Sequence, residues 1–219
     1  MWAGQAFPFR AANLSTMTKM LPPALDRLAR RLASEPAERP RQWIRPAAVL
    51  GLLTVTDGRA EVLFVVRRRT LRFHAGQVAF PGGGFEPADA DLWQTALRET
   101  EEEVGVGRDR IVRVGPLPSV HISVSGFTIR PWIGWTPARP ALRLDASEVE
   151  RALWVPLGEL RAAHRRVTRE RAGVRYETPE YPVGGVVVWG ATGRMLEHLL
   201  DRLTPEDETA LERGDGWTL

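Results

Sequence analysis

Two apolar runs in direct succession constrain the fold of this chain more than any other feature. AAVLGLLTVT (residues 47–56) precedes AEVLFVVR (60–67), and Asp57 and Gly58 stand in the short segment between them. Runs of this length around an Asp-Gly pair are typical of a β-hairpin. Because the first run is almost continuously apolar, we expect its strand to be buried on both faces. A sheet with such a strand needs a cover of helices on each side.

The rest of the chain interleaves strand and helix patterns. We expect helices over about 90–104, 158–166 and 190–203, and strands over 110–117, 127–136, 151–157 and 183–190. Upstream, leucines recur at 21, 25, 28 and 32, which predicts a short amphipathic helix followed by a proline-rich linker, together covering residues 21–45. The elements follow no regular βαβ rhythm. The expected fold class is therefore α/β, with a mixed β-sheet and helices on both faces.

The composition excludes several kinds of site and partner. The 219 residues include no cysteine, which excludes disulfides, cysteine-bound zinc and thiol nucleophiles. Residues 1–46 carry eight basic and three acidic residues, so the remainder of this chain of net charge +3 is close to neutral. That balance gives little support to a nucleic-acid partner. No apolar run reaches the roughly 18 to 20 residues of a membrane-spanning helix, so we expect no membrane partner either.

The first twenty residues differ in character from the rest. Residues 1–20 contain no acid and only Arg10 and Lys19 as basic residues. We expect a disordered leader there and a cytoplasmic location for the protein. The acid-poor opening leaves organellar targeting as an alternative.

A segment rich in glycine and then in acid follows the second apolar run. Residues 80–84 read FPGGG, and four of the five residues from 99 to 103 are glutamates. On a helix, Glu99, Glu102 and Glu103 share one face, because offsets of three and four return to it. Such a face is either solvated or compensated by a cation, and an all-oxygen ligand set suits Mg²⁺ or Mn²⁺. The preceding glycines favour the cation site.

The residues from Gly83 to Val106 resemble the Nudix box. The usual box has a glycine, five residues, a glutamate, seven residues and then an Arg-Glu pair that leads into two further glutamates and a glycine. Here Arg98 and the glutamates that follow it match every charged position of the second half. Two positions depart from the pattern: Thr100 stands where an aliphatic residue is usual, and Asp89 replaces the glutamate.

The first half of the box can be aligned in two ways. Asp89 follows Gly83 after five residues, but one extra residue then precedes Arg98. A strict count backwards places Gly84 and Ala90 in the two positions instead. We prefer the alignment with Asp89, which affects only the course of the loop.

A second resemblance lies directly upstream. LFVVRRRTLRFHAGQVAFPGG (residues 63–83) is similar to the signature of the coenzyme A diphosphatase branch of the Nudix hydrolases, with Arg67, Arg72 and Gly76 at its spacing. Val65 and Arg68 depart from it. That branch tends to have the longer box with aspartate. The likeness spans about 46–203, which predicts a Nudix hydrolase domain over 46–204 and a C-terminal tail over 205–219.

The resemblance implies a Nudix-type α/β/α sandwich and roles for the residues of the box. Glu99 and Glu103 are the implied metal ligands, Glu102 is a ligand or a base, and Arg98 orients a carboxylate. Gly82 and Gly83 are expected to let the backbone approach the substrate and curve around the helix start, where free N–H groups favour anions.

Substrate contacts are expected from the upstream signature. Arg67, Arg72 and His74 are candidates for the extra phosphate of coenzyme A, because arginine suits phosphate. A surface cluster of arginines is the alternative.

A further acid should lie outside the box, because three carboxylates on one helix reach a metal from one side only. Asp145, Glu148 and Glu150 stand just before a predicted strand. We favour Glu148 as a ligand or general base, because it aligns best with an acid in the related segment. If none of the three acts, Glu102 is the leading candidate.

The resemblance implies metal-dependent hydrolysis of coenzyme A or its thioesters to 3′,5′-ADP and a phosphopantetheine product. The same chemistry on ADP-ribose, a nucleotide sugar or another nucleoside diphosphate derivative is the alternative. A non-catalytic ligand-sensing module is an alternative of another class, although the intact glutamates argue against it. The small-molecule substrate is the expected partner, and a homodimer is left open.

Overall fold

The predicted hairpin lies at the centre of the sheet in the computed structural model, which describes residues 21–34, 45–71, 74–122, 126–171 and 173–216. Strand β1 (Arg45–Thr56) and strand β2 (Arg59–Arg67) pair antiparallel. Asp57 and Gly58 between them have φ angles of 50° and 69°. Positive φ at both central residues is the geometry of a tight hairpin turn, which explains the Asp-Gly pair.

The sheet that grows from this hairpin is mixed. Its path is β3-β2-β1-β7-β5, and β1 runs parallel to β7 (Phe127–Trp135), whereas the other pairings are antiparallel. Three more strands pair with β1, β7 and β2, namely β4, β6 and β8. The remaining bounds are β3 Val78–Ala79, β4 Gly82–Gly84, β5 Val112–Pro116, β6 Val120–Ile122 and β8 Val149–Pro156.

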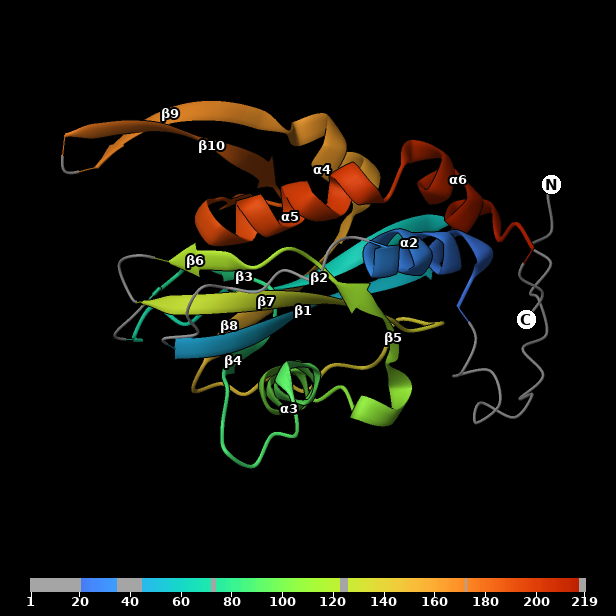
Figure 1. Ribbon diagram of the computed structural model, residues 1–219, viewed down its shortest axis with the longest axis horizontal. Helices are drawn as coiled ribbons and strands as arrows, with labels where there is room; N and C mark the ends of the chain where they lie inside the picture. The colour runs from blue at the N-terminus through green and yellow to red at the C-terminus, as the bar shows by residue number, and fades with distance from the viewer. Residues whose placement is uncertain (1–20, 35–44, 72–73, 123–125, 172, 217–219) are drawn as a thin grey trace, which may run out of the picture.

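Helices cover both faces of the sheet (Figure 1). Helix α3 (Leu92–Val104) lies on one face, and α2 (Pro23–Ser34) and α5 (Gly190–Arg202) lie on the other. Shorter elements are α4 (Leu157–Ala163), α6 (Pro205–Arg213) and a 3-10 turn at Arg108–Arg110. The predicted α/β/α sandwich with a mixed sheet is confirmed. None of the described helices is long and apolar enough to span a membrane.

The core is divided by the sheet into two clusters. Leu50, Leu52 and Leu63 point towards α3, whereas neighbouring residues of the same strands, such as Leu53 and Phe64, pack towards α2 and α5. β1 is thus buried on both faces, as its continuous apolar run predicts. Burial of this kind stabilises by about 25 cal/mol per Å² of apolar surface, which fixes the strand register beneath α3.

Three sequence expectations need correction. The helix expected over 158–166 ends at Ala163, and Arg165 begins strand β9 (Arg165–Arg171). The strand expected over 183–190 is divided by a turn at Gly184 and Gly185, both with positive φ, between β10 (Val174–Val183) and β11 (Val186–Val188). Residues 205–219, expected to be a tail, contain α6. The leader 1–20 and most of the linker lie outside the described residues.

Candidate active site

Helix α3 is fixed at both ends by its own sequence. The Asp91 side chain accepts a hydrogen bond from the Gln94 N–H, and Gly105 closes the other end at φ 72°. One face of the helix is buried against β1. Thr100 is fully buried on this face, and its hydroxyl donates to the Ala96 carbonyl at 2.7 Å. A threonine therefore replaces the usual aliphatic residue without an unpaired hydroxyl.

The glycine strand β4 lies directly against the acidic face of α3. A Cβ at Gly83 would come within 2.5 Å of Oε1 of Glu99, and a Cβ at Gly82, where φ is +153°, would collide with the Ala48 carbonyl of β1. The glycines are thus required by close approach. The expectation that they curve around the helix start is wrong, because they lie beside Glu99 and Glu103, and Asp91 caps the start.

Arg98 is the centre of the first group of charges. Its guanidinium donates to Asp89 through Nε (3.0 Å) and Nη2 (3.1 Å), and Nη1 lies 3.0 Å from both Glu99 Oε1 and Glu102 Oε2. Hydrogen bonds from Arg98 lower the pKa of Asp89 to about 2. This contact supports the alignment that places Asp89 at the acidic position of the box. Arg98 therefore contacts two of the proposed ligands.

Glu103 is the centre of a second group, formed with Arg67 and β4. Its side chain is 3 % exposed and accepts from Arg67 Nη1 and from the Gly82 N–H, each at 3.1 Å. Burial raises the pKa of Glu103 to about 7, although Arg67 and the Gly82 N–H oppose this. Two partners are therefore not enough to compensate the buried charge.

Glu148 is the acid outside the box that joins this group. Its Oε2 lies 3.5 Å from Arg67 Nη2, and its charge contributes to the raised pKa values of both Glu99 and Glu103, in which burial is the largest cause. Asp145 accepts instead from Ser147, within its own turn. Glu150 pairs with Arg69 at 3.8 Å. Of the three candidate acids, the geometry therefore favours Glu148.

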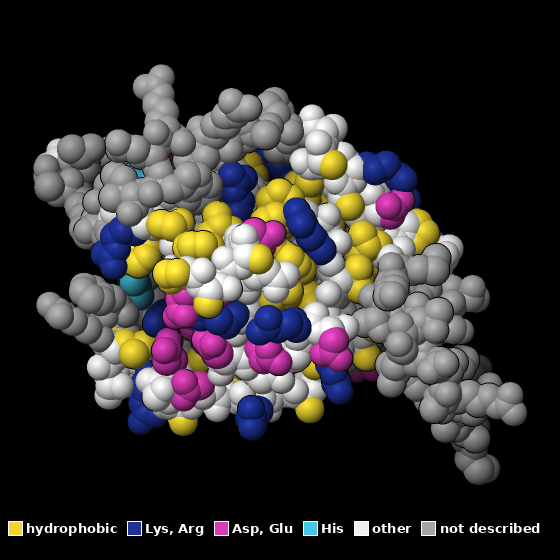
Figure 2. Space-filling view, turned by 60° about the horizontal axis from the view of Figure 1, so that its bottom comes forward, with side chains coloured by type: hydrophobic (Ala, Val, Ile, Leu, Met, Phe, Trp, Pro, Cys, Tyr) yellow, Lys and Arg dark blue, Asp and Glu magenta, His cyan; other side chains and the backbone are white. Residues whose placement is uncertain are grey.

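The site as a whole gathers acidic side chains among arginines on the α3 side of the molecule (Figure 2). Within the described ranges, no three histidines, aspartates or glutamates form a cluster able to hold a metal ion. Arg98 contacts both Glu99 and Glu102, and Arg67 contacts both Glu103 and Glu148. The donor set still fits a hard divalent cation. All the donors are carboxylate oxygens. Burial is the largest cause of the raised pKa of Glu99 and of Glu103, and Glu148 adds to the rise at both residues.

Two of the predicted substrate residues, Arg67 and His74, have different surroundings in the structure. Arg67 is engaged with Glu103 and Glu148, a pairing that the sequence reasoning missed. Its position, with the same parity along β2 as Leu63 and Val65, could have indicated that it faces α3. His74 is exposed, has φ 56°, and its Nδ1 lies 2.8 Å from Gln77 Oε1. Arg72 lies outside the described residues.

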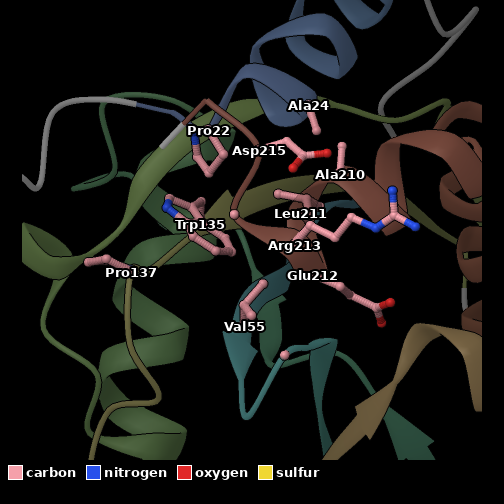
Figure 3. Close-up of a pocket in the computed structure, with 12 residues that line it drawn as sticks. Pro22, Ala24, Val55, Trp135, Pro137, Ala210, Leu211, Glu212, Arg213 and Asp215 are labelled. Atoms are coloured by element: carbon pink, nitrogen blue, oxygen red, sulfur yellow. The ribbon is translucent and has the colours of Figure 1, made fainter. Parts of the chain in front are cut away.

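A separate cavity of about 240 Å³ lies far from these carboxylates. It is formed where α2 and α6 meet the turn between β1 and β2, with Trp135 in its wall (Figure 3). It contains none of the residues of the box. We therefore assign the chemistry to the acidic face of α3.

Comparison with known proteins agrees with this geometry. The model of the NUDIX domain matches residues 44–175, more than half of the chain. The chain belongs to the Nudix family. A protein of Photorhabdus laumondii named "Uncharacterized Nudix hydrolase NudL" is 33 % identical over 161 residues, covering 73 % of this chain and 85 % of that protein. Nudix hydrolase 3 of Caenorhabditis elegans is 31 % identical over 177 residues and covers 73 % of each chain.

A solved structure of a MutT/nudix family protein from Enterococcus faecalis is also similar. It is 16 % identical, with a TM-score of 0.49, and the match covers 86 % of this chain and 73 % of that one.

The family membership of the present chain gives its chemistry. The chain is an enzyme, a hydrolase that acts on diphosphate bonds of nucleoside diphosphate derivatives. Members of the family generally use divalent metals such as Mg²⁺ or Mn²⁺.

Proposed function

We propose that this Nudix hydrolase cleaves the diphosphate bond of coenzyme A or acyl-coenzyme A. The products are 3′,5′-ADP and phosphopantetheine or its acyl derivative. The upstream sequence with Arg67, Gly76 and the Phe80–Gly83 segment supports this substrate class. In the structure this upstream sequence leads into β4, where Gly82 and Gly83 lie against Glu103 and Glu99.

Each of the acidic residues and Arg98 has its own role in this proposal. Glu99, Glu102 and Glu103 would hold the cation, Mg²⁺ or Mn²⁺. When bound, such an ion neutralises diphosphate oxygens and lowers the pKa of water. Arg98, anchored by Asp89, holds Glu99 and Glu102 in place. Glu148 accepts the proton from the attacking water. The new bond joins that water oxygen to one phosphorus, and the bond from this phosphorus to the bridging oxygen breaks.

A single observation carries the catalytic part of the proposal. Glu103 is 3 % exposed, yet within the described residues its hydrogen-bond partners are one guanidinium and one N–H, and two neighbouring acids repel it. A structural ion pair does not need this surplus of negative charge. A site that binds a divalent cation does, because the cation adds the missing positive charge.

Substrate phosphate contacts complete the proposal. We propose that Arg72 and His74 contact the 3′-phosphate of coenzyme A. Of these two residues the structure describes His74, which lies between β2 and β3. Arg67 is near the same loop but has carboxylate partners. The homodimer and the cytoplasmic location remain part of the proposal.

The test is a substrate panel. The purified chain is incubated with Mg²⁺ or Mn²⁺ and with coenzyme A, acyl-coenzyme A, ADP-ribose, NADH or a nucleoside triphosphate, and the products are separated. We expect coenzyme A compounds to have the highest kcat/KM and to yield 3′,5′-ADP. A higher kcat/KM on ADP-ribose would reject the substrate assignment while leaving the hydrolase chemistry intact.

A further inference from the structure

Phe85 is an exposed aromatic residue that directly follows the glycine strand β4. It is one of four large hydrophobic residues exposed in the described part of the chain, and 39 % of it is exposed. The other three lie on the sheet of β9, β10 and β11 or directly after it. Figure 2 shows hydrophobic side chains next to the acidic ones on the α3 side of the molecule. A single exposed apolar residue needs no special role, so the case for Phe85 depends on its surroundings.

Phe85 points to the same side of the sheet as Gly83. β4 pairs with β1, with Gly83 opposite Ala48, and the Phe85 N–H donates to the Pro46 carbonyl at 3.0 Å, which continues this pairing by two residues. Alternate residues of a strand share a face, and a Cβ at Gly83 would meet the carboxylate of Glu99. Phe85 therefore projects on the Glu99 side of the sheet, about 7 Å further along the strand.

The backbone around Phe85 is fixed by hydrogen bonds on both sides. The Phe85 N–H is bonded to Pro46, and the next N–H, that of Glu86, donates to Asp89 Oδ2 at 3.0 Å. Asp89 is itself held by Arg98. An exposed ring on a fixed backbone is prepared for a ligand, because little freedom of the chain is lost when the ligand binds.

Three further residues continue from Phe85 across the sheet. Pro46 of β1 is opposite Thr128 of β7, and Thr128 is opposite His121 of β6. Pro46 shares its face with Ala48, which belongs to the core cluster beneath α3, and His121 Nδ1 lies 3.3 Å from Thr128 Oγ1. Figure 1 shows β4, β6 and the starts of β1 and β7 at one end of the sheet. This Phe85–His121 row crosses three strand spacings, or about 14 Å.

The chemistry of the Phe85–His121 row is that of a flat, uncharged group with a polar edge. An aromatic ring and a proline ring lie at one end, and a hydroxyl and an exposed imidazole lie at the other. Its four residues include no carboxylate and no arginine. A nucleobase has the matching chemistry, because its face stacks on aromatic rings and its edge forms hydrogen bonds. In a nucleoside diphosphate derivative the base is joined to the diphosphate through one ribose.

We propose that the Phe85–His121 row binds the nucleobase of the substrate. The Phe85 ring stacks on the face of the base. His121 hydrogen-bonds to the edge of the base through Nε2, because its Nδ1 faces Thr128. This inference rests on the proposed position of the diphosphate at α3. It applies to coenzyme A and to ADP-ribose alike, since both contain adenine.

The test separates the base from the diphosphate. ADP, which contains both, and inorganic pyrophosphate, which lacks a base, are titrated calorimetrically into the full chain with saturating Mn²⁺. We expect Phe85→Ala to weaken ADP binding about tenfold, as for the loss of one stacked base, and to leave pyrophosphate binding unchanged. Phe85→Tyr keeps an aromatic ring and should bind ADP as the wild type does.

Two further variants complete the test. Tyr176→Ala is the matched control, because Tyr176 is 42 % exposed but lies on β10, in the other sheet. It should leave both affinities unchanged. His121→Ala should weaken ADP binding about threefold, since one hydrogen bond is lost, and should not affect pyrophosphate.

Three results would overturn the inference. One is equal ADP affinity in the wild type and in Phe85→Ala. Another is an equal loss for ADP and pyrophosphate, which would mean that the variant disturbs the diphosphate site. The third is a loss in Phe85→Ala for 4′-phosphopantetheine but not for ADP, which would place the other arm of coenzyme A on the row.

Failure of the proposed function gives a different pattern. If the wild type binds neither ADP nor pyrophosphate, the diphosphate position at α3 is wrong and the inference fails with it. If Phe85→Ala loses ADP affinity while the wild type cleaves no coenzyme A compound, the substrate assignment is wrong and the inference stands.

Discussion

Two arginine–carboxylate centres lie at opposite ends of the acidic face of α3, and they differ in how well their charges balance. Arg98 satisfies Asp89, whose pKa falls to about 2. Arg67 does not satisfy Glu103, whose pKa rises to about 7 through burial. We infer that the contact between Arg98 and Asp89 mainly stabilises the fold, and we propose that a cation balances the negative charge at Glu103. Variants of each centre test this difference.

The largest effect should follow Glu103→Gln, which removes the charge but keeps the size. We expect kcat to fall about a thousandfold, since a bound metal contributes several kcal/mol of charge stabilisation. Steady-state kinetics with added Mn²⁺ measures this, and circular dichroism checks the fold. Near-normal kcat would show that the acidic face is only a solvated surface.

The same variant should change the pH dependence of stability without metal. In the wild type the folded state keeps a proton on Glu103 between its ordinary pKa of 4.5 and about 7. Stability contributed by this group is therefore present below pH 4.5 and falls as the pH rises to about 7. Glutamine does not titrate, so Glu103→Gln should lack that fall. Thermal unfolding in chelator from pH 4 to 8 compares the two, and parallel curves would contradict the assignment.

Glu148→Gln should have the next largest effect. We expect kcat to fall about a hundredfold, the lower end of the range for a general base, with little change in KM. Glu150→Gln is the matched control, because Glu150 pairs with Arg69 away from the box. A loss in the control and not in Glu148→Gln would move the base to Glu150. Full activity in both would leave Glu102 as the leading candidate.

Asp89→Asn should disturb the other centre, and mainly its stability. Removing the charged partner of Arg98 should cost about 1–3 kcal/mol in the free energy of unfolding. The wild-type contribution is complete above pH 3.8 and is lost as the pH falls towards 2, because the pKa of Asp89 is lowered in the folded state. Acid unfolding of Asp89→Asn should therefore begin at a higher pH than that of the wild type, because the variant lacks this contribution. Asp91→Asn is the control, because it changes a helix cap and should not alter the Arg98 contacts. Equal unfolding of wild type and Asp89→Asn would contradict the structural role.

The smallest effect should follow His74→Ala. If His74 contacts the 3′-phosphate, the preference for coenzyme A over 3′-dephospho-coenzyme A should fall about tenfold, because a charge-assisted hydrogen bond is lost. The dephospho compound is the internal control, since its kcat/KM should not change. An unchanged preference would leave the loop as surface charge.

The parts of the fold that could be predicted depend on local pattern. The hairpin at Asp57–Gly58 and the extent of α3 follow from turn residues, caps and apolar periodicity. The β9–β10 hairpin was missed because its strands are highly charged and β10 contains Pro179 and Pro182. Its stability comes from packing of β10 on α5 and from buried Glu180, which no local pattern shows.

The site, too, could be predicted from the sequence only where a local pattern exists. The shared face of Glu99, Glu102 and Glu103 follows from helical spacing, but the arginines between them do not. The Arg67 contact needs the end of β2 to lie beside the end of α3, which is a tertiary arrangement. Gly83 was predicted from the box, whereas its physical reason, the closeness of Glu99, required the structure.

The central claim is that the acidic face of α3 binds a divalent cation through Glu103. Calorimetric titration of Mn²⁺ into the metal-free chain at pH 8 tests it most directly, with Glu103→Gln and Glu101→Gln compared with the wild type. Glu101 pairs with Arg108 and serves as the control on the same helix. The account predicts saturable Mn²⁺ binding by the wild type and Glu101→Gln, and a large loss of affinity in Glu103→Gln. Equal Mn²⁺ affinity in all three chains, or none in the wild type, would contradict it.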